Sequence, residues 1–298
     1  MTSFWSFWVA IITLGVIFGC VWLLYAVRKS QTSDVETEQK MDHSFDGIEE
    51  YDNPMPKWWI HMFMATVVFS LVYLVLYPGL GNFKGYLGWS STGHWEQEVK
   101  EANEKYNPLF KALAAKPVET LAKDEAAMKI GQRLFANNCA VCHGSTGRGA
   151  LGFPNLTDND WLYGGDPAKI KETITHGRSA QMPAKGLNQA MTKADIGNLT
   201  HYLLSFSGRS DDTAAVEKGS KMFQTACAAC HGADAKGNQS VGAPNLTDNV
   251  WLYGSTASKI SQTITFGRAG VMPAQKDTLD EDKIHLLAAY VYSLSHKE

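Results

Sequence analysis

Two short stretches decide the fold of this chain. Cys139–His143 reads Cys-Ala-Val-Cys-His, and Cys227–His231 reads Cys-Ala-Ala-Cys-His. The spacing Cys-x-x-Cys-His is typical of the attachment site of a c-type haem, in which two thiols bond to the haem vinyl groups and the histidine binds the iron. A zinc ribbon would need four ligands around one ion, and a thioredoxin-like Cys-x-x-Cys would occur once, beside a βαβ pattern. The predicted attachment points are Cys139, Cys142, Cys227 and Cys230, and the predicted iron ligands are His143 and His231.

The two motifs lie within a larger repeat. Asn155–Gly164 recurs as Asn245–Gly254 with only Asp160 replaced, by Val250. The offset is 90 residues here (155 to 245) and 88 residues between the haem motifs (139 to 227). A period this long that occurs twice predicts duplicated domains rather than a solenoid. The chain therefore carries two related domains, each predicted to bind one covalent haem c.

Both repeats have the pattern of helices, and no stretch predicts a strand. Thr192 to Asp195 has the spacing of a capping box, with aspartate in place of the usual glutamate. Expected helices are 124–138, one from 168, 192–206, 213–226, one from 257, and 280–294. A protein core of about 85 residues is marginal alone, so we expect haem to fill much of each core.

Two apolar stretches, 4–27 and 58–80, contain no charged residue and are long enough to span a bilayer. A signal peptide is the alternative for the first, but it lacks a basic start and an Ala-x-Ala-like site. The loop between them holds Arg28, Lys29, Lys40 and Lys57, while the N-terminal tail holds no Lys or Arg. The positive-inside rule places this loop in the cytoplasm. Both termini are then expected in the bacterial periplasm, where c-type haem is attached.

A further segment, 92–115, has helical character and is expected to break at Pro108. Four of the five cysteines belong to the haem motifs, and the fifth, Cys20, lies in the first apolar stretch. The net charge of −3 shows no nucleic-acid footprint.

Met182 and Met272 are the predicted second iron ligands. Each precedes a proline in a loop between two helices, at an offset of 90 residues (182 to 272). A lone methionine usually packs in a core, but a repeated Met-Pro favours ligation. His176 is a rival ligand, although the repeat places Phe266 at its position. Two axial ligands leave no position for substrate, which indicates electron transfer. The spacing leaves open which methionine binds which iron.

Supporting residues also come in matched pairs. Pro154 and Pro244 are candidates to offer a carbonyl to the ring N–H of the ligating histidine, or they are simple turn prolines. Arg178 and Arg268 are candidates to pair with haem propionates, or they are solvated. The aromatic residues expected to wall the pockets are Trp161, Tyr163, Trp251 and Tyr253.

The segment Asp46–Trp59 reads Asp-Gly-Ile-Glu-Glu-Tyr-Asp-Asn-Pro-Met-Pro-Lys-Trp-Trp. With two spans and two haem repeats, this chain resembles the dihaem subunit III of cbb3-type cytochrome c oxidases, the CcoP/FixP family. Some members of that family have only the span after this segment. The resemblance implies an all-α fold: two transmembrane helices followed by two tandem class I cytochrome c domains. The implied segments are 1–57 (first span and cytoplasmic loop), 58–82 (second span), 83–121 (periplasmic linker), 122–210 and 211–298 (haem domains).

The resemblance also implies a role in the bacterial inner membrane. A soluble periplasmic cytochrome c would donate electrons, which would pass through the two haems to a monohaem subunit and on to the haem–copper subunit that reduces oxygen. The chain would then be an electron-transfer subunit and no enzyme by itself. In this family Met272 has also been inferred to bind the haem of His143, and Met182 that of His231. Two alternatives remain: a dihaem carrier for another terminal reductase, and a dihaem peroxidase with one displaceable ligand.

Overall fold

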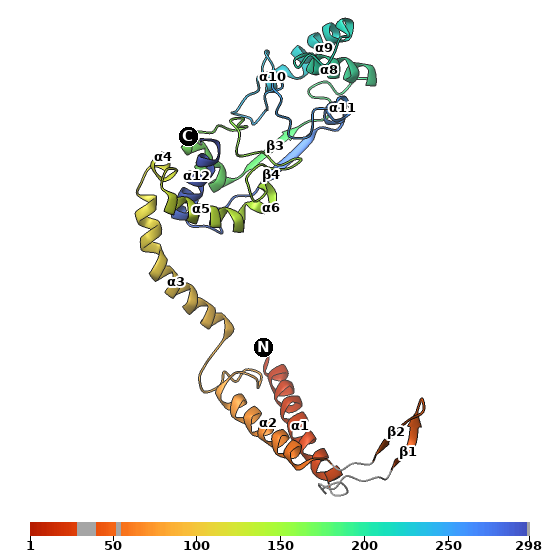
Figure 1. Cartoon of the computed structure of the whole chain (residues 1–298), viewed down its shortest axis with the longest axis vertical. Helices are drawn as coiled ribbons and strands as arrows, with labels where there is room; N and C mark the ends of the chain where they lie inside the picture. The colour runs from red at the N-terminus through yellow and green to blue at the C-terminus, as the bar shows by residue number, and fades with distance from the viewer. Residues whose placement is uncertain (29–39, 52–54, 297–298) are drawn as a thin grey trace. The chain divides into compact units, whose positions relative to one another are not determined.

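The computed structural model describes residues 1–28, 40–51 and 55–296. The chain divides into two compact units, Met1–Lys105 and Tyr106–Glu298. Helix is the main secondary structure in both (Figure 1), so the predicted all-α class is confirmed. Lys29, one of the basic loop residues, lies outside the described residues.

The N-terminal unit contains two helices that are long and apolar enough to cross a membrane, α1 (Ser3–Arg28) and α2 (Lys57–Leu76). The second ends earlier than expected, with Tyr77 as its cap, because Pro78 cannot continue it. Between the two helices, β1 (Lys40–Phe45) and β2 (Ile48–Tyr51) form an antiparallel hairpin. Asp46 and Gly47 both have positive φ, which is the geometry of a tight hairpin turn.

Helix α3 (Ser91–Ala114) runs through Pro108 without ending, so the predicted break there is wrong. The proline costs the helix one backbone hydrogen bond, to the carbonyl of Glu104. Glu104 is exposed, so water can satisfy that carbonyl. The short helix α4 (Val118–Leu121) follows after Pro117.

The haem-motif region has the same order of elements in each repeat. Six of its helices begin at a side chain that accepts backbone N–H groups: Asp124, Asp166, Thr192, Asp212, Thr256 and Asp280. The elements are α5 (Glu125–Asn138), α6 (Ala140–His143), α7 (Pro167–His176), β3 (Arg178–Met182) and α8 (Lys193–Ser205), then α9 (Thr213–Ala226), α10 (Ala228–His231), α11 (Ala257–Phe266), β4 (Arg268–Met272) and α12 (Glu281–Ser295).

The last helix of each repeat packs in the core of the other repeat. Helix α12 contacts α4, α5 and α7, whereas α8 contacts α9 and α11 (Figure 1). Leu287 of α12 is thus buried with Phe135 of α5, and Leu199 of α8 with Phe223 of α9. We call α4–α7 with α12 the first half, and α8–α11 the second half. The predicted segments 122–210 and 211–298 each supply helices to both halves.

A glycine at matched positions permits this close helix packing. A Cβ atom on Gly131 of α5 would lie 2.8 Å from the Cβ of Tyr290 on α12. A Cβ atom on Gly219 of α9 would lie 2.2 Å from the carbonyl oxygen of Asn198 on α8. Both distances are too short for a methyl group, so the two crossings depend on the absence of a side chain.

The two halves are joined by a two-stranded antiparallel ribbon of β3 and β4, visible between them in Figure 1. Its register runs from Arg178 opposite Met272 to Met182 opposite Arg268. Strand β3 leads from α7 of the first half to α8 of the second, and β4 leads from α11 of the second half to α12 of the first. The ribbon therefore carries the chain across in both directions.

Candidate haem sites

Each Cys-x-x-Cys-His motif lies at a helix end that is fixed by backbone hydrogen bonds. Helix α5 ends at Asn138, and Cys139 N–H donates to the carbonyl of Phe135 at 2.8 Å. The one-turn helix α6 then places Cys142 and His143 within a single turn of Cys139. The second half repeats this arrangement around α10, with Cys227 N–H bonded to Phe223. None of the four motif cysteines forms a disulfide with another described cysteine.

The two motif histidines are buried and held in a defined orientation. Nδ1 of His143 lies 3.0 Å from the carbonyl oxygen of Pro154, and Nδ1 of His231 lies 3.1 Å from that of Pro244. A carbonyl only accepts, so Nδ1 carries the proton and donates it. Nε2 is then unprotonated in each ring and able to bind a metal.

Burial also sets the ionisation of these groups. It lowers the pKa of His231, with the bond to Pro244 acting in the opposite sense, so the imidazole favours its neutral form. Burial and the neighbouring thiol raise the pKa of Cys139 and of Cys227 to about 11. Before haem is attached, these two groups therefore keep their protons at neutral pH.

Met182 ends β3 and Met272 ends β4. Each methionine lies at the half that contains the haem motif of the other repeat. Met272 packs against the core of the first half, which contains His143. After Met182 the chain runs along the second half, where Lys185 N–H donates to the carbonyl of Ile264 at 2.7 Å. Each methionine is therefore delivered to the half that holds the haem motif of the other repeat.

The arginine that follows α7 in the first half and the arginine that follows α11 in the second half are held in the same way. In the first half the Arg178 guanidinium carbon lies 4.8 Å from the ring centre of Tyr163, and its Nε donates to the Thr173 hydroxyl at 2.9 Å. The matching residues of the second half are Arg268, Tyr253 and Thr263. There the two distances are 4.4 Å and 3.0 Å. Both arginines are thus fixed beside the methionine that faces them across the ribbon.

A buried polar atom without a partner tests whether a haem fits. The Tyr163 hydroxyl is buried, and no described residue hydrogen-bonds to it. Such a group costs about 1–3 kcal/mol if nothing satisfies it. It therefore indicates an absent polar partner, for which a haem propionate is suited. Two thiols, an imidazole with a free Nε2 and a methionine in each half complete a set of groups that fits haem c.

The structure also shows where the other predicted residues lie and which residues the sequence did not indicate. His176 ends α7 with an exposed side chain. Trp161 and Trp251 pack against the first and second cores. The sequence reasoning missed Thr173 and Thr263, although their offset of 90 residues (173 to 263) is a readable signal. It also missed Glu172, which pairs with Arg178 at 2.9 Å.

Comparison with known proteins agrees with this geometry. Residues 126–203 and 214–291 match the family described as cytochrome c oxidase, cbb3-type, subunit III. Residues 37–84 match the N-terminal domain of cytochrome oxidase-cbb3, FixP. The chain belongs to the CcoP/FixP family, subunit III of cbb3-type cytochrome c oxidases.

Curated relatives span nearly the whole chain. The CcoP subunit of Rubrivivax gelatinosus is 47% identical over 98% of this chain and 95% of its own length. The FixP subunit of Azorhizobium caulinodans is 42% identical over 85% of this chain and 91% of its own. The CcoP subunit of Cereibacter sphaeroides is 38% identical, over 86% and 94%. These relatives favour a CcoP/FixP electron-transfer subunit over a peroxidase or a carrier for another reductase.

Membership of the CcoP/FixP family also confirms the coarser expectations. The two cytochrome c domains are of the kind that binds haem c. The chain is a subunit of a larger oxidase, so other oxidase subunits are its partners. Its two candidate spans anchor it in a membrane.

Proposed function

We propose that this chain holds two covalently bound haem c groups and relays electrons through them. The donor is a soluble periplasmic cytochrome c, and the acceptors are the monohaem subunit and then the haem–copper subunit of the oxidase. The observation that carries the proposal is the matched pair of sites, each with two thiols, an oriented histidine and a methionine. Bound haem supplies a reversible one-electron iron couple.

The side chains of each site have distinct roles. Cys139 and Cys142 hold one haem covalently, as do Cys227 and Cys230 the other. The histidine binds through Nε2, and its bond to a proline carbonyl fixes the ring and raises its basicity. The methionine would be the second protein ligand of the iron, and a haem held in this way would supply electron transfer rather than binding of oxygen or peroxide. Electrons therefore pass through these sites without chemistry on a substrate.

The methionine ligands are crossed between the repeats: Met272 serves the haem of His143, and Met182 that of His231. This assignment is supported by the packing of Met272 in the first core and by the bond from Lys185 to Ile264 in the second half. The exchanged α8 and α12 follow the same crossing. If each methionine instead bound the haem of its own repeat, it would have to reach the half from which its strand comes rather than the half to which its strand leads.

The haem domains face the periplasm, and the hairpin between the spans faces the cytoplasm. The basic residues Arg28 and Lys57 at the ends of the spans, with Lys40 in the hairpin, support this orientation. Attachment of c-type haem on the outer side of the membrane supports it independently.

Haem content tests the proposal directly. Chain purified from membranes should carry two haems by pyridine haemochrome assay, remain haem-stained on a denaturing gel, and show low-spin spectra typical of histidine–methionine ligation. Oxidase subunits should purify with it. One haem per chain, loss of haem on the gel, or a high-spin ferric form as isolated would overturn it.

A further inference from the structure

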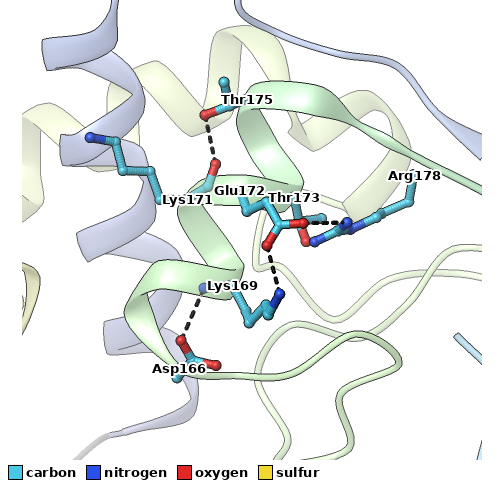
Figure 2. A network of polar contacts seen from close by, with 7 residues as sticks. All are labelled: Asp166, Lys169, Lys171, Glu172, Thr173, Thr175 and Arg178. Atoms are coloured by element: carbon cyan, nitrogen blue, oxygen red, sulfur yellow. Dashed lines mark hydrogen bonds and ion pairs between the residues drawn. The ribbon is translucent and has the colours of Figure 1, made fainter. Parts of the chain in front are cut away.

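One acidic residue breaks the symmetry between the two haem sites. Helices α7 and α11 occupy matched positions, and each is followed by Gly-Arg, but Glu172 of α7 is replaced by Gln262 in α11. In the first half, Arg178 Nη1 donates to Glu172 at 2.9 Å, and Lys169 Nζ donates to the same carboxylate at 2.8 Å. Figure 2 shows this carboxylate lying between the two cations.

The second half has the cations without the carboxylate. Arg268 donates through Nε and Nη2 to the hydroxyl of Thr263, at 3.0 and 2.8 Å. Lys259 Nζ lies 3.4 Å from the neutral side-chain oxygen of Gln262. Within the described ranges no acid pairs with Arg268. The same pair of cations is therefore partly neutralised in the first half and not in the second.

Glu172 stays charged at any physiological pH. Hydrogen bonds from Lys169 and Arg178, in that order, lower its pKa to about 2. The other charge differences around these helices do not reverse the asymmetry. Lys171 is an added cation of α7, but it pairs with Glu281 of α12 at 2.9 Å. Asp166 adds a second carboxylate, at the start of α7, where the second half has a neutral threonine.

A nearby positive charge favours the reduced iron, because reduction adds an electron. Arg178 faces Met272 across the ribbon and Arg268 faces Met182, so each arginine belongs to one site. A carboxylate bonded to the arginine opposes that effect. We propose that Glu172 holds the reduction potential of the haem at His143 below that of the haem at His231. This inference rests on the proposed function, since it requires a haem in each half.

The consequence is a fixed order of the two sites. An electron shared between the two haems resides mainly on the haem of His231. The haem of His143, in the first half, therefore gives up its electron more readily. Glu172 is a tuning residue and touches no reacting atom. Its side chain is 40% exposed, so solvent and salt screen the charge. We therefore expect a severalfold change in the ratio of ferrous to ferric haem at a given ambient potential.

Redox titration of the full-length protein tests the proposal. Glu172→Gln should raise the lower of the two midpoint potentials and leave the upper one in place. Gln262→Glu should lower the upper potential, and the double variant should reverse the order of the sites. Glu172→Asp keeps the charge and should keep a lower potential closer to wild type than Glu172→Gln does.

Glu217→Gln is the matched control, because Glu217 forms an exposed ion pair with Lys221 within α9, a helix that carries neither arginine. It should move neither potential. The proposal is overturned if Glu172→Gln leaves both potentials unchanged, or if it moves the upper potential. A chain with fewer than two haems, or without histidine–methionine spectra, would instead refute the proposed function. Thermal unfolding of each variant separates a change of charge from a loss of fold.

Discussion

Replacing Leu287 by alanine tests the exchange of terminal helices. Leu287 lies in α12, is completely buried, and packs in the first core, although it belongs to the second repeat. Removing its branched end deletes three carbons and leaves a cavity, which costs about 3 kcal/mol. That cost should fall on the first half. Amide exchange in α5 should then accelerate roughly a hundredfold, since about 1.4 kcal/mol corresponds to a factor of ten.

The measurement is hydrogen exchange of the intact protein, followed by mass spectrometry of peptides from α5 (Glu125–Asn138) and α9 (Thr213–Ala226). Leu199→Ala is the matched control. Leu199 lies in α8, is 1% exposed, and packs in the second core, so this variant should accelerate exchange in α9 more than in α5. If Leu287→Ala affected α9 and spared α5, the exchanged arrangement would be refuted.

Four other outcomes are expected. Met182→His and Met272→His should each lower one haem potential, because imidazole stabilises ferric iron better than a thioether; redox titration that finds neither potential moved would make both methionines packing residues. In a variant that lacks the haem-binding cysteines of the second motif, only Met272→His should change the remaining haem. Hydrogen bonds from the Thr192 backbone and hydroxyl lower the pKa of Asp195 from its usual 3.8, so its contribution to stability is full above pH 3.8 and is lost as the pH falls further. The difference in unfolding free energy between wild type and Asp195→Asn should therefore shrink in acid, and a difference independent of pH would contradict this role. Protease added to intact spheroplasts should remove the haem domains and spare residues 28–57; cleavage within that loop from outside would reverse the topology.

The helices and their starts were predictable because their signals are local. Helix α9 has the predicted bounds, and the capping box of Thr192 and Asp195 forms with both of its hydrogen bonds. The motif spacing indicated the histidines, and the matched positions of Pro154 and Pro244 made them candidates for the carbonyls that the histidine rings contact. The absence of predicted strands was wrong, since β1–β2 and β3–β4 form two ribbons. Asp46-Gly47 is a two-residue hairpin signal that was overlooked, because the strands beside it do not alternate cleanly.

The exchange of α8 and α12 could not be predicted from local pattern. The two repeats present nearly the same surfaces, with a glycine at the same position in α5 and α9, so either terminal helix satisfies either partner by pattern alone. The β3–β4 ribbon has the same origin, since it pairs the matched strands of the two repeats, centred on Ala180 opposite Gly270, which are 90 positions apart. A difference between the two repeats was also informative. The sequence shows glutamate at position 172 and glutamine at the equivalent position 262, but only the position of Arg178 shows why that difference matters.

The exchange also has a consequence for how the chain is made. A ribosome delivers the N-terminal end first, yet α5 acquires its covering helix only when residues 281–295 have been synthesised. The apolar face of α8 also stays uncovered until α9 has been synthesised. A late stop codon that removed α12 would leave the second motif with its own helices intact. The truncation would instead remove part of the core around the first motif, although that motif is encoded earlier in the gene.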